Sequence, residues 1–240
     1  MPGLYKDEGV VLKTIKLGEA DRIVTIFTRQ NGKVRAVAKG VRKTKSRFGG
    51  RLEPFTRVQL LIYRGRSLDT ITGADIVDPF HEVRKDLVRL TSASALVELV
   101  DKITPERERA FSTYALLVAG LRALADAKGE TVVPAFLVKL LSISGYHPEL
   151  KACAGCGNTT MLGGFSPALG GAVCRNCWHE DSESFALTDD RLALIGRLLQ
   201  ADFGVPAEGS VAAEVTQALR RYAEYHLERP LRTLQLLRAV

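Results

Sequence analysis

The sequence predicts an α+β protein with two domains: a small N-terminal β-barrel, and a helical domain that contains an inserted zinc element. Residues 1–79 hold short stretches rich in β-branched and aromatic residues, whereas residues 80–240 show mainly helical spacing of apolar side chains. All four cysteines fall within residues 153–177, as two Cys-x-x-Cys pairs. The length of 240 residues suffices for one large domain or two modest ones.

The expected strands follow from alternating apolar residues and from the turn residues between them. They lie near residues 10–17, 22–28, 33–39, 57–63 and 68–76. Asn31-Gly32, between the second and third strands, is the strongest short hairpin signal. Four or five short strands favour a barrel that closes on itself and leaves few edges exposed. The five-stranded OB-fold fits this size and charge, and an SH3-like barrel fits the pattern nearly as well.

Residues 33–51 form the most basic stretch of the chain, with eight Lys or Arg and no Asp or Glu. In its first part Lys33, Arg35 and Lys39 fall on one side of a strand, where Val37 is the single apolar residue. Like charges at this density repel one another unless an anion lies among them, which favours contact with phosphates. A solvated charged loop is the alternative.

We therefore predict a DNA- or RNA-binding surface on this strand and loop. Its candidate residues are Lys33, Arg35, Lys39, Arg42, Lys43, Lys45, Arg47 and Arg51. Phe48 either stacks on a base or folds back onto the barrel.

The charge of the whole chain is unevenly distributed. Residues 1–80 carry sixteen basic and eight acidic side chains, a net charge of +8, whereas the remaining residues are close to neutral within the total of +7. A nucleic-acid-binding module attached to a neutral body would show this distribution. No apolar run approaches the roughly 20 residues of a membrane span, and the N-terminus has no signal-peptide pattern. We expect a cytoplasmic protein.

Asp78-Pro79 marks the expected start of the helical domain. Helices are expected over residues 83–103, 104–128, 131–144, 188–199 and 210–226. Thr104-Pro105-Glu106 would begin the second of these helices, with Thr as N-cap and Pro at the first helical position. Gly129 and Gly145 would follow helix ends.

The cysteine pairs predict a structural zinc site within about residues 150–180. Cys153 and Cys156 form one Cys-x-x-Cys turn and Cys174 and Cys177 the other, with seventeen residues between them. This spacing is typical of a tetrahedral four-thiolate site, whose closed coordination sphere leaves no position for a catalytic water. Disulfides between these cysteines are the alternative, but they need an oxidising compartment, and the sequence shows no secretion signal. A redox motif would need only one pair beside a strand–helix–strand unit.

The sequence also lacks the common motifs of nucleotide and metalloenzyme chemistry. It contains no GxxxxGK[ST], no GxGxxG and no HExxH. We therefore predict a binding protein and not an enzyme.

Several segments together resemble the RecO family of bacterial DNA repair proteins. They are Glu19–Val34, Ala38–Phe55 and Tyr222–Leu237, and the Phe165–Cys177 segment is similar to members that keep zinc. The most specific part of the resemblance is the basic segment, which contains Lys39, Gly40, Lys45, Ser46, Arg47, Leu52, Pro54 and Phe55. Many relatives lack some or all of the cysteines, so the zinc is expected to brace the fold.

The resemblance implies an N-terminal OB-fold and recombination mediation at the nucleoid. Proteins of this family bind single- and double-stranded DNA and anneal complementary strands. With RecR they load RecA onto DNA coated by single-strand-binding protein, without nucleotide hydrolysis. The resemblance also implies that the acidic C-terminal tail of single-strand-binding protein docks between helices of the second domain. Arg220, Arg221 or Arg232 would pair with its carboxylates, unless they form ion pairs with neighbouring helices.

Two other functions remain open from the residues alone. An RNA-binding or ribosome-associated OB-fold protein would have the same barrel, charge and zinc element. A zinc-dependent transcription regulator would need a basic recognition helix, whereas here the charge lies on a strand and loop.

Overall fold

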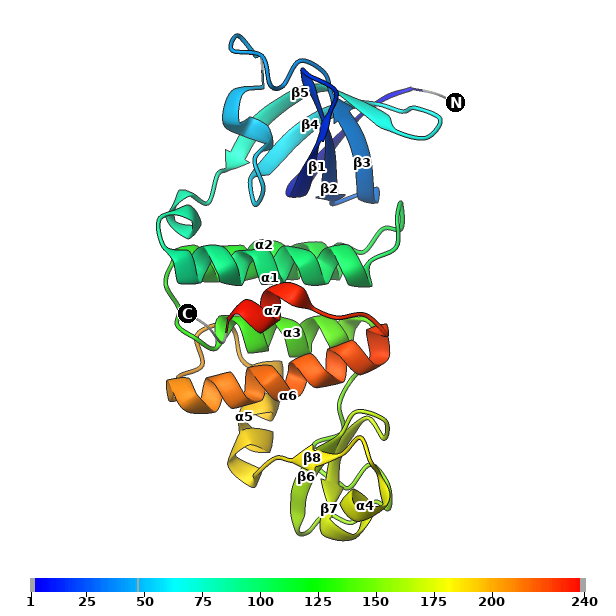
Figure 1. Ribbon diagram of the computed structural model, residues 1–240, viewed down its shortest axis with the longest axis vertical. Helices are drawn as coiled ribbons and strands as arrows, with labels where there is room; N and C mark the ends of the chain where they lie inside the picture. The colour runs from blue at the N-terminus through cyan, green and yellow to red at the C-terminus, as the bar shows by residue number, and fades with distance from the viewer. Residues whose placement is uncertain (1–2, 47, 238–240) are drawn as a thin grey trace. The chain divides into compact units, whose positions relative to one another are not determined.

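The computed structural model describes residues 3–46 and 48–237 (Figure 1). Its contacts divide the chain into two compact units, a barrel unit of residues 1–125 and a helical unit of residues 126–240. The domain boundary expected from the sequence lies between residues 79 and 80, and it stays a prediction. The compact unit that holds the barrel continues to Ala125. No helix within the described residues is long and apolar enough to cross a membrane.

Five strands close into a barrel at the N-terminus. They are β1 (Leu4–Leu17), β2 (Asp21–Thr28), β3 (Gly32–Ala38), β4 (Arg57–Tyr63) and β5 (Asp69–Asp78), in the order β1-β2-β3-β5-β4 with β4 pairing back to β1. Every pair is antiparallel except β3 with β5. This closed five-stranded arrangement confirms the OB-fold.

The long strand β1 makes the closure possible. Its register shifts between Val11 and Lys13, so the strand is irregular at that point. The N-terminal half pairs with β4 and the C-terminal half with β2. A bulge bends the strand that carries it, which is why one strand can belong to both sides of the barrel.

The barrel core is filled by the inward side chains of all five strands, including Val24, Ile26, Ala36 and Ile71. The loop between β3 and β4 adds to this core through the 3-10 helix η1 (Gly49–Leu52). Phe48 and Leu52 are each 1% exposed and pack among the strand residues. Complete burial of one such side chain stabilises the fold by about 1.5–3 kcal/mol.

Two helices complete the barrel unit: α1 (Leu87–Ile103) and α2 (Phe111–Ala125), after the short 3-10 helix η2 (His81–Arg84). The carboxylate of Asp86 accepts a hydrogen bond from the Arg89 N–H and caps α1. The expectation that a helix begins at Thr104 is wrong. The Thr104 hydroxyl donates instead to the Val100 carbonyl, 2.6 Å away, and closes α1.

The connection between α1 and α2, residues 104–110, lies along β3. The Arg107 N–H donates to the Lys33 carbonyl at 2.9 Å, and Glu106 forms a parallel bridge with Lys33. β3 pairs with β5 only at Ala36 and Val37, which leaves the backbone around Lys33 available. Backbone hydrogen bonds at this strand edge outweigh the capping signal of Thr104.

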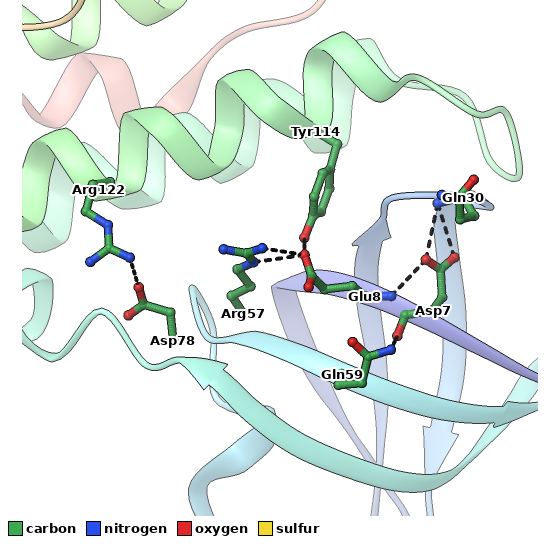
Figure 2. Close-up of polar contacts among 8 residues, drawn as sticks. All are labelled: Asp7, Glu8, Gln30, Arg57, Gln59, Asp78, Tyr114 and Arg122. Atoms are coloured by element: carbon green, nitrogen blue, oxygen red, sulfur yellow. Dashed lines mark hydrogen bonds and ion pairs between the residues drawn. The ribbon is translucent and has the colours of Figure 1, made fainter.

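Side chains of α2 also hold the helix against the barrel (Figure 2). The Tyr114 hydroxyl donates to Glu8 at 2.8 Å, and Arg57 donates to the same oxygen at 2.7 and 2.9 Å. Arg122 forms an ion pair with Asp78. Burial raises the pKa of Glu8, but the hydrogen bonds from Tyr114 and Arg57 outweigh it and hold that pKa below its usual value. The carboxylate is therefore ionised at neutral pH.

The helical unit contains α3 (Val132–Ile143), α5 (Asp189–Gln200), α6 (Gly209–Leu227) and α7 (Arg232–Leu236). α3 packs against α5 and α6 and is buried on nearly all sides. Gly145, at φ +94°, follows its end, as expected. The short α7 follows Pro230, which separates it from α6.

A small sheet lies between α3 and α5 in the chain and carries the cysteines. It consists of β6 (Leu162–Ser166), β7 (Gly171–Cys174) and β8 (Phe185–Ala186), in the order β7-β6-β8, with the short helix α4 (Arg175–Glu180) after β7. The β6–β7 hairpin connects the two cysteine pairs.

Candidate nucleic-acid interface and metal centre

The predicted nucleic-acid residues lie on β3 and on the loop that follows it. Lys33 and Arg35 are on β3, Lys39 follows its end, and Arg42, Lys43 and Lys45 are exposed on the loop over residues 39–46. Arg51 is half-buried on η1. Arg47 lies outside the described residues.

Lys33 and Arg35 face acidic groups of the barrel unit. The Lys33 ammonium lies 3.4 Å from an Asp101 carboxylate oxygen and donates to the Asp101 carbonyl at 2.5 Å. Arg35 lies 4.0 Å from Glu106. Both cations are therefore already partly neutralised by α1 and the connection after it. The freely presented charge lies on the loop.

Hydrogen bonds to residues 18–21 shape the loop and hold it beside the β1–β2 turn. Gly40, at φ +68°, turns the chain, and its N–H donates to Asp21 at 2.7 Å. The Arg42 N–H donates to the Ala20 carbonyl and its guanidinium to the Gly18 carbonyl, both at 3.0 Å. These bonds fix the loop backbone and leave Lys43 and Lys45 exposed.

Phe48 is part of the barrel core and not of the surface. At 1% exposure it occupies the second of its two expected positions, folded back onto the barrel. Its burial fixes the end of the basic loop to the core, and its ring has no face open to a base in this structure.

The structure brings further cations to the barrel surface that the sequence reasoning did not include. Lys16 is exposed at the end of β1, beside the β1–β2 turn. Arg64 and Arg66 are exposed in the β4–β5 loop. OB-folds bind nucleic acid on the face of strands 2 and 3 and with these two loops. The Arg-Gly-Arg sequence at residues 64–66 is the signal from which Arg64 and Arg66 could have been predicted.

The four cysteines come together as predicted. Their sulfur atoms all lie within 4.8 Å of one another, and those of Cys156 and Cys174 are 3.8 Å apart. A tetrahedral site with Zn–S bonds of about 2.3 Å requires sulfur atoms about 3.8 Å apart. The sulfur atoms are therefore close to the spacing of a tetrahedral metal site.

The surroundings of the cysteines favour a cation between them. Burial raises the pKa of the Cys153 thiol, but the N–H of Cys174, at 3.3 Å, and neighbouring amides lower it to about 6. Hydrogen bonds to the sulfur atoms of Cys156 and Cys153 raise the pKa of Cys177 to about 12. Four sulfurs this close cannot all be thiolates unless a positive charge lies among them.

Two neighbours complete this centre. Gly155 lies close to the centre: a Cβ there would lie 3.1 Å from the Cys177 sulfur, so a side chain would require the cysteine to shift by a few tenths of an ångström. Trp178 packs against the cysteines. His179 is exposed and stacks on Trp178, so it is not among the clustered ligands.

The three arginines predicted to receive a partner's tail lie in the helical unit, and each has contacts of its own. Arg220 pairs at 2.6 Å with Glu224 of the same helix, α6, whereas the alternative left open by the sequence was an ion pair with a neighbouring helix. The Arg221 guanidinium lies 4.0 Å from the centre of the Phe185 ring. Arg232 begins α7 and is also engaged.

A separate hollow of about 470 Å³ lies at the end of α5 in the same unit. Exposed Arg197 lines it, together with the apolar side chains of Phe203, Val205 and Pro206. The hollow thus combines the Arg197 cation and an apolar surface with the carboxylate of Asp202, which also lines it.

Comparisons with known proteins agree over the whole chain. The model of the family "Recombination protein O N terminal" matches residues 1–80, and that of "Recombination protein O C terminal" matches residues 84–235. The chain is 43% identical to a protein of Bifidobacterium adolescentis named DNA repair protein RecO, over 98% of this chain and 99% of that one. Proteins of the same name from Nocardioides sp. and Frankia casuarinae are 44% and 42% identical, over 96% and 98% of this chain and 98% of each relative.

Proposed function

This chain belongs to the recombination protein O (RecO) family of DNA repair proteins, and we propose that it binds DNA through the basic loop of its barrel. As a member of this family it is a recombination mediator and not an enzyme. In this function the chain holds single and double strands by their phosphates and anneals complementary strands. It acts in the cytoplasm at the nucleoid.

The exposed cations of the loop are the observation that carries the proposal. Within the described part of the chain, no acidic side chain pairs with Lys39, Lys43 or Lys45. The backbone under them is held by hydrogen bonds to the β1–β2 turn, so the charges stay close together. A fixed group of unneutralised cations is stabilised when phosphates replace its counterions.

Annealing follows from the same charges. Two complementary strands repel one another through their phosphates, and a surface that neutralises both lowers this repulsion. Base pairing then begins without energy from a nucleotide. This agrees with the absence of nucleotide-binding motifs in the sequence.

We propose that the metal of the four-cysteine centre is zinc. Four thiolates at tetrahedral spacing are the typical ligand set of structural Zn²⁺. With no ligand position left for water, the ion would hold the β6–β7 hairpin to the preceding Cys-x-x-Cys turn and take no part in DNA chemistry.

We further propose that the chain acts with RecR to load RecA onto DNA coated by single-strand-binding protein. The acidic, apolar C-terminal tail of that protein would dock on the helical unit. Arg220 and Arg221 are already in contact with Glu224 and Phe185. The hollow beside Arg197 offers the tail an exposed cation next to apolar side chains, and Asp202, which also lines the hollow, would limit where the carboxylates of the tail can lie.

Reversal of the loop charge tests the DNA site. The double variant Lys43→Glu/Lys45→Glu should weaken binding of single-stranded and duplex DNA severely and slow annealing, with an unchanged circular-dichroism spectrum. The matched control is Lys6→Glu/Lys151→Glu, which changes the net charge equally at two other exposed lysines. If the loop variant anneals at the wild-type rate in low salt, the loop is only a solvated surface.

The salt dependence of binding counts the phosphate contacts. If Lys39, Arg42, Lys43 and Lys45 each meet one phosphate, the log–log slope for single strands should be about −2.8, at about −0.7 per contact. Titrations of single-stranded DNA and of RNA of equal length, each at two salt concentrations, measure the slope. Tighter binding of the RNA would favour the ribosome-associated alternative.

A tail peptide tests the docking site. Arg197→Glu should lower its affinity about fivefold, the effect of one exposed ion pair of about 1 kcal/mol. Exposed Arg229→Glu is the control. If Arg220→Glu weakens the peptide and Arg197→Glu does not, the tail binds at α6.

A further inference from the structure

Part of the outer face of strands β1, β2 and β3 is covered within the barrel unit itself. Lys13 of β1 pairs with Thr25 of β2, and Thr25 pairs with Arg35 of β3, so the three residues point to the same face. That face is the outer one, because their neighbours Val24 and Ala36 belong to the barrel core. Thr25 is nevertheless only 2% exposed. The middle of this row is therefore covered by another part of the unit.

Carboxylates from the covering segments bind the cations of this row and of β3. Asp101, in the last turn of α1, lies between two lysines of different strands: one of its oxygens is 2.5 Å from the Lys13 ammonium and the other 3.4 Å from that of Lys33. Glu106, in the connection after α1, lies 4.0 Å from the Arg35 guanidinium. Each carboxylate thus occupies the kind of position beside a cation that a phosphate would take.

Helix formation does not explain an acidic residue at the position of Asp101. The last turn of a helix carries partial negative charge, so a carboxylate there is disfavoured unless cations lie beside it. Lys33 also donates to the Asp101 main-chain carbonyl at 2.5 Å. The end of α1 therefore presents the strands with a combined anionic group, made of a carboxylate and a helix C-terminus.

Two of the three cations remain within reach of a ligand from solution. The Lys13 and Arg35 side chains are 50% and 43% exposed, whereas that of Lys33 is only 12% exposed. A phosphate that approaches Lys13 or Arg35 must compete with a carboxylate already beside it. Lys43 and Lys45 of the basic loop have no such carboxylate among the described residues.

The connection that carries Glu106 is firmly attached to the barrel. The Arg107 N–H donates to the Lys33 carbonyl, and the Arg107 guanidinium donates to the buried Asp69 carboxylate, both at 2.9 Å. The backbone around Glu106 is therefore fixed. Competition with DNA concerns the side chains only and needs no movement of the connection.

We propose that Asp101 and Glu106 compete with DNA from within the protein: they bind Lys13 and Arg35 in place of phosphates and confine the DNA site to the basic loop. The inference rests on the proposed function of the loop. It adds an affinity-limiting role for the end of α1 and the connection after it, which withhold part of the barrel face from DNA. The alternative role of these ion pairs is only to brace α1 on the barrel.

The test is the double variant Asp101→Asn/Glu106→Gln in the full chain, which removes both charges and keeps the shapes of the side chains. The affinity for oligothymidine should rise about tenfold, the combined effect of two exposed ion pairs at about threefold each. The log–log salt slope should steepen from about −2.8 to about −4.2, because two further cations meet phosphates at about −0.7 each. Circular dichroism and thermal unfolding show whether the variant is folded.

The matched control is Asp75→Asn/Glu108→Gln. It removes one aspartate and one glutamate charge from the same unit, and both side chains are exposed and without an ion pair among the described residues. Its salt slope should stay at about −2.8, with a smaller gain in affinity. Glu106→Gln alone leaves the contacts of Asp101 in place and should steepen the slope by about 0.7. It keeps the test decisive if Asp101→Asn loosens α1.

A double-mutant cycle tests the competition at one cation. Lys13→Gln should change the affinity for oligothymidine little in the wild-type protein, where Asp101 occupies this lysine. In the Asp101→Asn protein the same substitution should lower the affinity about threefold.

Three outcomes would overturn the proposal: an unchanged slope in Asp101→Asn/Glu106→Gln and in Glu106→Gln, an equal gain in the control, or an equal effect of Lys13→Gln in both backgrounds. The acids would then only brace α1 or act through the net charge. Lys43→Glu/Lys45→Glu is judged separately. Wild-type binding by that variant would remove the loop site, whereas an unchanged slope beside a defective loop variant would remove only the competition.

Discussion

The carboxylate of Asp69 is a fully buried charge that joins β5 to the α1–α2 connection. It accepts hydrogen bonds from the Tyr5 hydroxyl at 2.6 Å, from Arg107 at 2.9 Å and from the Gly65 N–H at 3.0 Å. Burial raises the pKa of Asp69, but the hydrogen bonds from Arg107, Tyr5 and Gly65 hold it below the ordinary 3.8. The ionised form is therefore the one that stabilises the fold.

Asp69→Asn should lower the free energy of unfolding by about 2 kcal/mol at pH 7, the loss of a charged hydrogen-bond acceptor. Since the native pKa is depressed, this contribution is present above the ordinary value of 3.8 and is lost as the pH falls below it. Urea unfolding of both proteins from pH 7 to pH 3 measures the difference. A difference that stays constant down to pH 3 would contradict the assignment.

Gly32 is a second residue on which the barrel unit depends. At φ +65° its position already favours glycine, and a Cβ there would lie 1.9 Å from the Glu108 carbonyl oxygen. The chain around Glu108 belongs to the α1–α2 connection, so a side chain at this position would push the connection off β3.

Gly32→Ala should therefore destabilise the protein well beyond the roughly 1 kcal/mol of left-handed backbone strain. Gly49→Ala is the matched control, because Gly49 has φ +49° but nothing within 4 Å of its Cβ position. Thermal unfolding of the two variants separates the clash from the strain. Equal melting temperatures would mean that the connection moves aside without cost.

At the scale of elements, the metal centre holds together a small sheet with little apolar core of its own. The buried cluster there comprises Cys153, Val173 and Cys174, with Leu162 and Trp178 against it. This cluster is small for about thirty ordered residues, even with Phe165 packed against Phe185 and against Tyr222 of α6. The metal is therefore expected to supply much of the stability of this element.

Cys156→Ser should release the metal, lower the melting temperature and open residues 150–180 to proteolysis. DNA binding should largely survive once the protein is kept folded, because the basic loop is in the other unit. Metal analysis of reduced protein purified without chelator gives the ion and its stoichiometry, expected to be one zinc per chain. Protein without zinc under these conditions would rule the site out.

At the scale of the whole molecule, the barrel depends on the helices that follow it in the chain. Phe27 of β2 is fully buried although its side chain lies on the outer face, and its ring lies 6.4 Å from that of Tyr114 on α2. Glu8 and Asp69 also receive hydrogen bonds from Tyr114 and Arg107. Removal of α1 and α2 would expose this ring and leave both carboxylates short of partners.

A fragment of residues 1–125 should therefore unfold cooperatively, whereas a fragment of residues 1–79 should be unstable or aggregate. Circular dichroism during urea unfolding compares the two. A stable, monomeric 1–79 fragment that binds DNA would show instead that the sequence-domain boundary is also the folding boundary.

The sequence was sufficient where a signal is local. Alternating residues and Asn31-Gly32 predicted the strands, Gly145 the end of α3, and the two Cys-x-x-Cys turns the metal centre. Each depends on residues within a few positions of one another, and backbone propensity or ligand spacing determines them directly.

Tertiary structure decided what depends on residues distant in sequence. Thr104 has the pattern of a helix start, but the free edge of β3 draws the following segment into strand-like pairing. The sequence left two positions open for Phe48, stacked on a base or folded back onto the barrel, and the barrel interior buries it. Lys33 belongs to the basic run, yet Asp101, 68 residues away, partly neutralises it. In each case burial or pairing with a remote segment outweighs the local preference, because those contacts form only once the barrel and helices have assembled.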